Sequence, residues 1–212
     1  IVVSKELELT LTGKSCGAEE RAPMCGVPYH AVEGYLNKLV ANGHKVAICE
    51  QVEDPKLAKG LVKREVIRIV TPGTNTDMQA LDESKNNYIM CIVYLADKYG
   101  ISLADISTGD YFVTEVDTER KLIDEINKFA PSEIICNESF YMSGVDLSDM
   151  KNRLGIAVYS LEAWYFSDET AENTLKEHFK VQSLEGLGLS DYACGTIAAG
   201  ALLRYLYETQ KN

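Results

Sequence analysis

The sequence feature that most constrains the fold is a run of chain-breaking residues about a third of the way along the chain. Residues 71–76 (TPGTNT) concentrate proline, glycine and asparagine, and the chain then stays polar up to residue 87, broken mainly by Leu81. Such a composition favours turns over helices and strands. We therefore expect two folded units, residues 1–77 and 88–212, joined by an exposed, protease-sensitive linker over residues 78–87 and the breaker before it.

The charge is distributed unevenly between these two units. Residues 1–77 carry 10 basic and 10 acidic side chains, whereas residues 78–212 carry 11 basic and 22 acidic ones, so the second unit accounts for the whole net charge of −11. Such an asymmetry suggests different partners for the two units. The acidic second unit would repel phosphates, so we do not expect it to hold a nucleic acid by itself.

The general composition is that of an ordinary globular protein. The 212 residues are 46% hydrophobic, enough to bury a core without disulfide or metal staples. No apolar run approaches the ~18 residues of a membrane span, and no secretory signal opens the chain, so we expect a cytoplasmic protein with no membrane partner. The chain begins without Met in the middle of a patterned segment, and we interpret it as part of a longer protein.

The six cysteines show no zinc-binding spacing, and we interpret them as reduced, buried thiols. A metal site is a minor alternative, and its ligands would be Cys16, Cys25, His30 and His44.

The first unit is predicted to be a small mixed domain of β-α-β-turn-β order. Residues 7–12 alternate as in a strand, and apolar residues recur with helical spacing over residues 32–40, with Gly43 as the stop. A buried strand over residues 45–51 should follow. A short helical turn at Asp54 and another strand over residues 61–70 would complete the unit.

The second unit is predicted to hold a mixed sheet with helices on its faces. Three strands with short turns open it, and helices then alternate with strands, which gives the order β-β-β-α-β-α-β-α-α. The predicted elements are strands 88–95, 101–107 and 111–116, helix 119–129, strand 133–136, helix 147–154, strand 156–159 and helices 168–179 and 190–209. The fold class is α/β, and this order is the one seen in RNase H-like folds.

An RNase H-like order raises the alternative of a metal-dependent nuclease, which would need clustered carboxylates. The carboxylates in suitable places are Asp105, Asp110, Asp168 and Glu169, but the first strand carries none. We therefore interpret Asp105 and Asp110 as strand-edge and turn residues.

The basic stretch around Lys63 and Arg64 is either a solvated edge or a strand that contacts phosphates. A purely structural spacer is a third hypothesis.

Several long runs, in the same order along the chain, carry a family resemblance. They are residues 22–33 (APMCGVPYHAVE), 35–40 (YLNKLV), 46–51 (VAICEQ), 70–74 (VTPGT), 104–109 (ADISTG) and 131–134 (PSEI). The chain closely resembles the MutS family of DNA mismatch-recognition proteins over its whole length. The resemblance implies most of the mismatch-binding domain followed by the connector domain.

The resemblance also implies a function. Members of this family are clamp-shaped dimers that bind mismatched duplex DNA, couple recognition to ATP hydrolysis and recruit MutL through surfaces that include the connector. Their ATPase domain would lie beyond residue 212, so no catalytic residue, enzyme activity, metal or cofactor is expected in this chain. ATP and Mg²⁺ would bind elsewhere in the whole protein.

By position against the family pattern, six residues are predicted to contact DNA: Lys14, Met24, Tyr29, His30, Lys63 and Arg64. Met24 and Tyr29 are equally compatible with a place in the core. A partner-facing surface is predicted on helix 168–179, at Asn173, Thr174 and Lys176.

One departure from the family pattern affects mismatch recognition. The family reads a mismatch with a Phe-x-Glu motif, and no Phe of this chain has Glu two residues later. Such a Phe acts as a wedge that opens stacking at a mispair. We therefore expect weak binding without mismatch preference.

Overall fold

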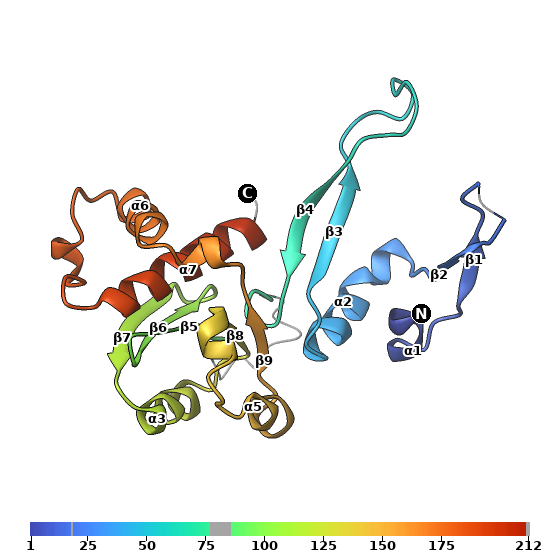
Figure 1. Ribbon diagram of the computed structural model, residues 1–212. Helices are drawn as coiled ribbons and strands as arrows, with labels where there is room; N and C mark the ends of the chain where they lie inside the picture. Colours follow the sequence, from blue (N-terminus) through green and yellow to red (C-terminus); the bar gives the residue numbers. More distant parts are fainter. Residues whose placement is uncertain (18, 77–85, 211–212) are drawn as a thin grey trace.

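The computed structural model describes residues 1–17, 19–76 and 86–210, and Figure 1 shows two parts of different character. One part is a layered α/β domain built on a five-stranded sheet. The other contains short helices and two separate antiparallel strand pairs, one of which projects away from the rest of the molecule. The mixed α/β class predicted from the sequence is confirmed.

The first unit contains short elements joined by loops. They are α1 (Val2–Glu6), β1 (Thr12–Lys14), β2 (Ala22–Met24), the 3₁₀ helix η1 (Tyr29–Ala31), α2 (Val32–Ala41), β3 (Val46–Gln51) and β4 (Arg64–Val70). Helix α2 is confirmed, and Gly43 ends it with a φ of +82°. The strand predicted over residues 7–12 is wrong. The chain reverses there, because Glu8 has a φ of +54° and the Leu9 N–H donates to the Ser4 carbonyl at 2.8 Å.

Strands β3 and β4 form a two-stranded antiparallel sheet, here called the ribbon. Its root, where Val46 pairs with Val70, packs on Leu36 and Val40 of α2. Beyond the root, little of the ribbon is buried, so the prediction of a buried strand over residues 45–51 is right about the strand and wrong about its burial. The reason is topological, because no third strand pairs with the ribbon among the described residues, and α2 packs on its root.

The second unit contains strands and longer helices near the predicted positions, together with one short α-helix and two 3₁₀ helices that were not predicted. Its elements are β5 (Ile89–Leu95), β6 (Lys98–Asp105), β7 (Asp110–Val116), α3 (Glu119–Phe129), β8 (Glu133–Cys136), α4 (Glu138–Tyr141), α5 (Leu147–Leu154), β9 (Ala157–Ser160), η2 (Ala163–Phe166), α6 (Asp168–Phe179), η3 (Glu185–Leu187) and α7 (Ala193–Thr209). The short helix α4 was not predicted. It forms because the side chain of Asn137 caps it, accepting from the Phe140 N–H at 3.2 Å.

The five strands lie in the order β7-β6-β5-β8-β9, with β5, β6 and β7 antiparallel and β8 and β9 parallel to β5. Helices cover both faces, as Figure 1 shows, with α7 on one side and α3 and α5 on the other. Alternate residues of β5 therefore enter two different cores. Met90 and Ile92 pack with α3 and α5, whereas Cys91 packs under α7.

The segment that joins the two units departs most from expectation. The breaker was predicted to be exposed, yet Thr71, Thr74 and Asn75 are buried, and so is Asn87 at the start of the second unit. Burial is tolerated because their polar groups bond to one another: the Asn87 side-chain amide donates to the carbonyls of Pro72 and Asn75 at 3.1 and 3.2 Å. Residues 77–85, which include most of the predicted linker, lie outside the described residues.

The cysteines divide into two groups. Cys91, Cys136 and Cys194 are buried as predicted, but Cys16 and Cys49 are exposed and Cys25 is half-buried. Burial raises the pKa of the Cys136 thiol to about 12, and burial together with Cys136 raises that of Cys91. The buried thiols are therefore protonated and unreactive at neutral pH.

This division predicts the pattern of thiol labelling. In the folded chain, a maleimide should modify Cys16 and Cys49 first and Cys25 more slowly, and all six thiols should react in denaturant. Mass spectrometry of tryptic peptides measures the order. Modification of Cys91 or Cys136 at the rate of Cys49 would show that the described core is wrong.

Candidate nucleic-acid interface

The six residues predicted to contact DNA are all exposed and lie in three regions of the first unit. Lys14 and Met24 belong to the β1–β2 hairpin, Tyr29 and His30 to η1, and Lys63 and Arg64 to the base of the loop that joins the ribbon strands. Figure 1 shows the hairpin and the ribbon as two arms whose loops point to the same side of the molecule. The core alternative is wrong for Met24 and Tyr29, and Tyr29 is 86% exposed.

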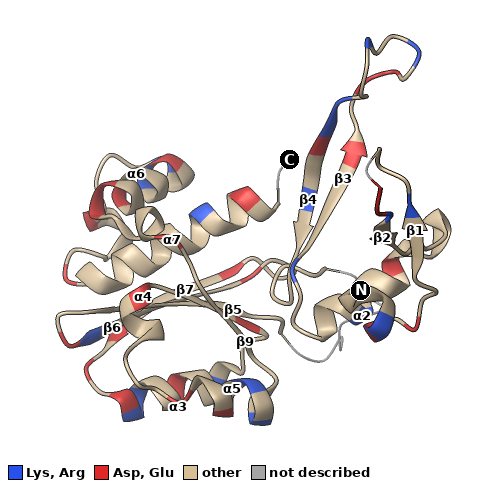
Figure 2. Ribbon diagram, turned by 45° about the vertical axis from the view of Figure 1, so that its right-hand side comes forward, with Lys and Arg blue, Asp and Glu red and all other residues tan. Residues whose placement is uncertain are grey.

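Figure 2 shows Lys and Arg residues on the ribbon loop and at the adjoining end of β4, and others nearer the root. The Lys63 ammonium lies 2.6 Å from Glu65 Oε1, so these two side chains share a face, and the Arg64 guanidinium donates to the Val62 carbonyl at 3.3 Å. Both partners of the ion pair are more than half exposed, so the pair contributes little free energy. A phosphate can therefore replace Glu65 at low cost.

The ribbon loop, residues 52–63, contains exposed apolar residues that sequence reasoning missed. The Val52 N–H donates to the Lys63 carbonyl at 3.1 Å and closes the loop. Leu57 is 80% exposed and Leu61 is 95% exposed, close in sequence to the basic residues. The available signal was two leucines interspersed with lysines, although Leu61 falls in the strand predicted over residues 61–70, which begins only at Arg64.

His44, one of the four residues in the alternative metal site, has another partner. Its Nε2 lies 2.8 Å from Glu6 Oε2, and this bond lowers the pKa of the Glu6 carboxyl. Within the parts of the chain that the structure describes, no three His, Cys, Asp or Glu side chains are placed to hold a metal ion. The structure therefore does not bring the Cys16, Cys25, His30 and His44 set together.

Asp105 and Asp110 serve a turn, as the sequence indicated. Asp105 is buried at the end of β6. One carboxylate oxygen accepts the Asn87 N–H at 2.9 Å and the other accepts the Ser107 N–H at 2.8 Å. Asp110 pairs with Asp105 across the β6–β7 register. These backbone donors account for the burial of the Asp105 carboxylate.

The predicted partner-facing surface on α6 is only partly available. Asn173 is exposed, and the Lys176 ammonium pairs with Glu172 Oε1 at 2.5 Å. Thr174, however, is only 9% exposed, so its assignment as a partner contact is wrong. Helix α6 packs on α7 through Ala171, Thr174 and Leu175, and this contact cannot be seen in the sequence of α6 alone.

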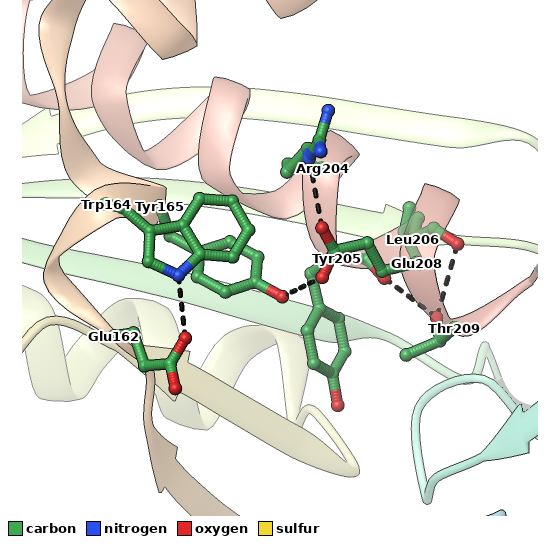
Figure 3. Close-up of polar contacts among 8 residues, drawn as sticks. All are labelled: Glu162, Trp164, Tyr165, Arg204, Tyr205, Leu206, Glu208 and Thr209. Carbon is green, nitrogen blue, oxygen red and sulfur yellow. Dashed lines mark hydrogen bonds and ion pairs between the residues drawn. The ribbon is translucent and has the colours of Figure 1, made fainter.

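Next to this helix lies an aromatic cluster that the sequence analysis did not single out (Figure 3). The ring of the partly exposed Trp164 stacks on Tyr165 at a centroid distance of 3.9 Å, and its Nε1 donates to Glu162 at 2.7 Å. The Tyr165 hydroxyl donates to Glu208, which also pairs with Arg204 at 3.1 Å and so joins η2 to α7. Tryptophan, tyrosine and arginine are the residues most enriched at interface hot spots.

Comparisons with known proteins cover the whole of this architecture. The family model for MutS domain I matches residues 1–79, and that for MutS domain II matches residues 87–212. No helix of the described residues is long and apolar enough to cross a membrane.

Curated relatives agree with the family models. The chain is 65% identical over 212 residues to the DNA mismatch repair protein MutS of Lachnoclostridium phytofermentans, with 100% of this chain and 23% of that protein covered. It is 50% identical over 213 residues to MutS of Acetivibrio thermocellus and 49% identical over 218 residues to MutS of Alkaliphilus metalliredigens, in each case with 99% of this chain and 24% of the relative covered. The chain thus spans about a quarter of the length of these relatives. With both domain models matched in chain order and with relatives of this similarity, the chain belongs to the MutS family of DNA mismatch repair proteins.

Proposed function

We propose that this chain is the DNA-contacting and connector region of a MutS-type mismatch-repair ATPase. In this proposal the first unit binds the backbone of mismatched duplex DNA, and the second relays the bound state to the ATPase and to MutL. The whole protein would act in the cytoplasm as a homodimer and would bind ATP and Mg²⁺ outside this chain. The observation that carries the proposal is the set of exposed cations on the part matched by MutS domain I.

Electrostatics support DNA contact by the first unit. Lys63 and Arg64 lie on a projecting ribbon, where a duplex can approach without meeting the acidic second unit. Cations that neutralise phosphates release condensed counterions, which favours binding strongly at low salt. Lys14 on the neighbouring hairpin would add a second backbone contact on the same side.

The apolar and aromatic side chains of the first unit support groove contact. Met24 and Tyr29 are exposed on adjacent elements, and His30 follows Tyr29 on η1. All five Phe residues of the chain lie in the second unit, at positions 112, 129, 140, 166 and 179. This chain therefore supplies no Phe wedge next to its cations, and we infer that it contacts duplex DNA without reading the mispair.

The acidic second unit suits protein contact better than DNA contact. Asn173 and Lys176 on α6 and the Trp164 cluster beside it form the surface that we assign to partners such as MutL. Since Trp164 is the only tryptophan of the chain, its fluorescence reports directly on binding at this surface.

Fluorescence anisotropy of a labelled duplex tests DNA contact by this chain. We expect weak binding that strengthens steeply as salt is lowered, and no cleavage of the duplex when Mg²⁺ is added. Absence of binding even at low salt would contradict the proposed DNA contact, and Mg²⁺-dependent cleavage would favour a nuclease instead.

A further inference from the structure

Glu133, the first residue of β8, is a buried carboxylate in the contact between the two units. Its side chain is 0% exposed, and each of its oxygens has its own donor. Oε2 accepts the Gly73 N–H at 2.9 Å, and Oε1 accepts the Tyr205 hydroxyl at 2.6 Å. Gly73 belongs to the segment that follows β4, whereas Tyr205 belongs to α7, so one carboxylate joins the end of the ribbon to a helix of the second unit.

The segment bonded to Glu133 is a hydrogen-bonded turn. The Thr71 N–H donates to the Thr74 hydroxyl at 2.9 Å, and the Thr74 N–H donates to the Thr71 carbonyl at 3.2 Å. The backbone of Gly73 passes close to the sheet, since a Cβ on this residue would lie 2.7 Å from Ile89 Cβ and 3.2 Å from Glu133 Oε2. The carboxylate therefore bonds to a turn whose backbone lies close against the sheet.

The other strand of the ribbon is attached at the same place. Lys45 immediately precedes β3, and its ammonium lies 3.9 Å from the ring centre of Tyr159 and 4.8 Å from that of Tyr205. Burial lowers the pKa of Lys45, and the negative charge of Glu133 opposes this effect. The Tyr159 hydroxyl donates to the Gly43 carbonyl, at the end of α2.

The root of the ribbon is thus attached to the second unit on both strands by one group of side chains, made of Lys45, Glu133, Tyr159 and Tyr205. At this root, Val46 of β3 pairs with Val70 of β4. An isolated two-stranded ribbon is only marginally stable, so the direction of this one depends on its root. The paired strand of about six residues is roughly 20 Å long, and a small rotation at the root moves its far end by several ångströms.

We propose that Glu133 is the positioning residue that fixes the direction of the ribbon, and with it the place of Lys63 and Arg64, relative to the second unit. This proposal rests on the proposed function only for the consequence at DNA, since the positioning itself can be measured without DNA. Glu133 acts through Gly73 and Tyr205, and its strand β8 lies in the sheet of the second unit, away from the projecting end of the ribbon (Figure 1).

Two substitutions separate positioning from simple loss of a charge. Glu133→Ala removes both acceptors and leaves the Gly73 N–H and the Tyr205 hydroxyl without their partner. Glu133→Gln keeps the shape. Its carbonyl can accept the Gly73 N–H and its amide can donate to the Tyr205 oxygen, so the hydrogen-bond connection is retained without the negative charge. Glu138→Ala, which removes an exposed carboxylate at the start of α4, is the matched control.

The test is a pulsed electron spin resonance measurement on the 212-residue chain, with spin labels at Lys59→Cys on the ribbon loop and Asn127→Cys on α3. The exposed or half-buried Cys16, Cys25 and Cys49 are replaced by serine. We expect one narrow distance distribution for the parent, for Glu138→Ala and for Glu133→Gln, and a distribution at least about twice as wide for Glu133→Ala. Circular dichroism checks that each variant is folded.

An unchanged narrow distribution in folded Glu133→Ala would overturn the proposal. If that variant does not fold, Tyr205→Phe takes its place, because it removes one donor and keeps the aromatic ring beside Lys45. Broadening in Tyr205→Phe supports the proposal, and an unchanged distribution overturns it. Lack of DNA binding by the parent would contradict the proposed function alone and leave the distance result intact.

Discussion

Replacing Gly200 with alanine is expected to lower the stability of the second unit by about 2 kcal/mol. Gly200 lies in the middle of α7 where α6 crosses it, and a Cβ there would lie 2.3 Å from Ala171 Cα and 2.5 Å from Ala171 Cβ. Separating two packed helices to relieve such an overlap costs about 3 kcal/mol. The higher helix propensity of alanine offsets roughly 1 kcal/mol of this cost. The net loss corresponds to a decrease in Tm of about 4–8 °C.

Gly186→Ala is the control for this prediction. Gly186 lies in η3, its φ is not positive, and a Cβ there would meet no atom within 4 Å. The free energy of unfolding of this variant should differ from that of the parent by less than about 0.5 kcal/mol. Thermal unfolding followed by circular dichroism compares the two variants. Equal Tm values for Gly200→Ala and the parent would show that α6 and α7 are not packed as described.

Replacing Lys63 and Arg64 together with alanine is expected to weaken duplex binding by roughly tenfold at low salt. The two side chains are exposed near the far end of the ribbon, and neither belongs to the packed root. Each lost phosphate contact removes about 0.9 from the slope of log K against log salt, so the slope should flatten by about one to two units. Anisotropy titrations at four salt concentrations measure both effects.

The double variant Lys121→Ala, Lys128→Ala is the matched control. It removes the same charge from α3 of the second unit, where the two lysines pair with Asp117 and Glu125. Binding should fall only slightly, through the change in net charge. If both double variants lose affinity equally, then the ribbon is not the contact surface and net charge alone governs binding.

Periodicity predicted most of the second unit because each helix there buries one face and each strand enters a packed sheet. Helix α3, with Leu122 and Ile126 buried at i and i+4, is the clearest case. Where an element has no such packing, the prediction failed. Residues 7–12 alternate like a strand, but only Thr12 lies in one. Residues 45–51 were predicted to form a buried strand, but beyond the root packed on α2 the ribbon pairs with no third strand among the described residues.

The candidate DNA surface was predicted from the family pattern, and Lys63 and Arg64 also stand out in the sequence as part of a basic stretch. Features that depend on contacts between distant segments were not visible. In the sequence, Glu133 is a single polar residue at the start of an apolar strand. Only the fold brings the Gly73 N–H and the Tyr205 hydroxyl to its two oxygens. The same holds for Thr174, whose burial depends on α7, and for the breaker at residues 71–76, which packs against the sheet instead of crossing solvent.

The central claim is that this chain contacts the DNA backbone without reading the mispair. It is tested most directly by titrating the chain against a duplex with one G·T mispair and against its fully matched counterpart at several salt concentrations. Phosphate contacts carry no information about base pairing, so the account predicts equal affinities and equal salt slopes for the two duplexes. A reproducible preference of about tenfold or more for the G·T duplex would contradict it, and would mean that exposed groups such as Met24 and Tyr29 read the mispair.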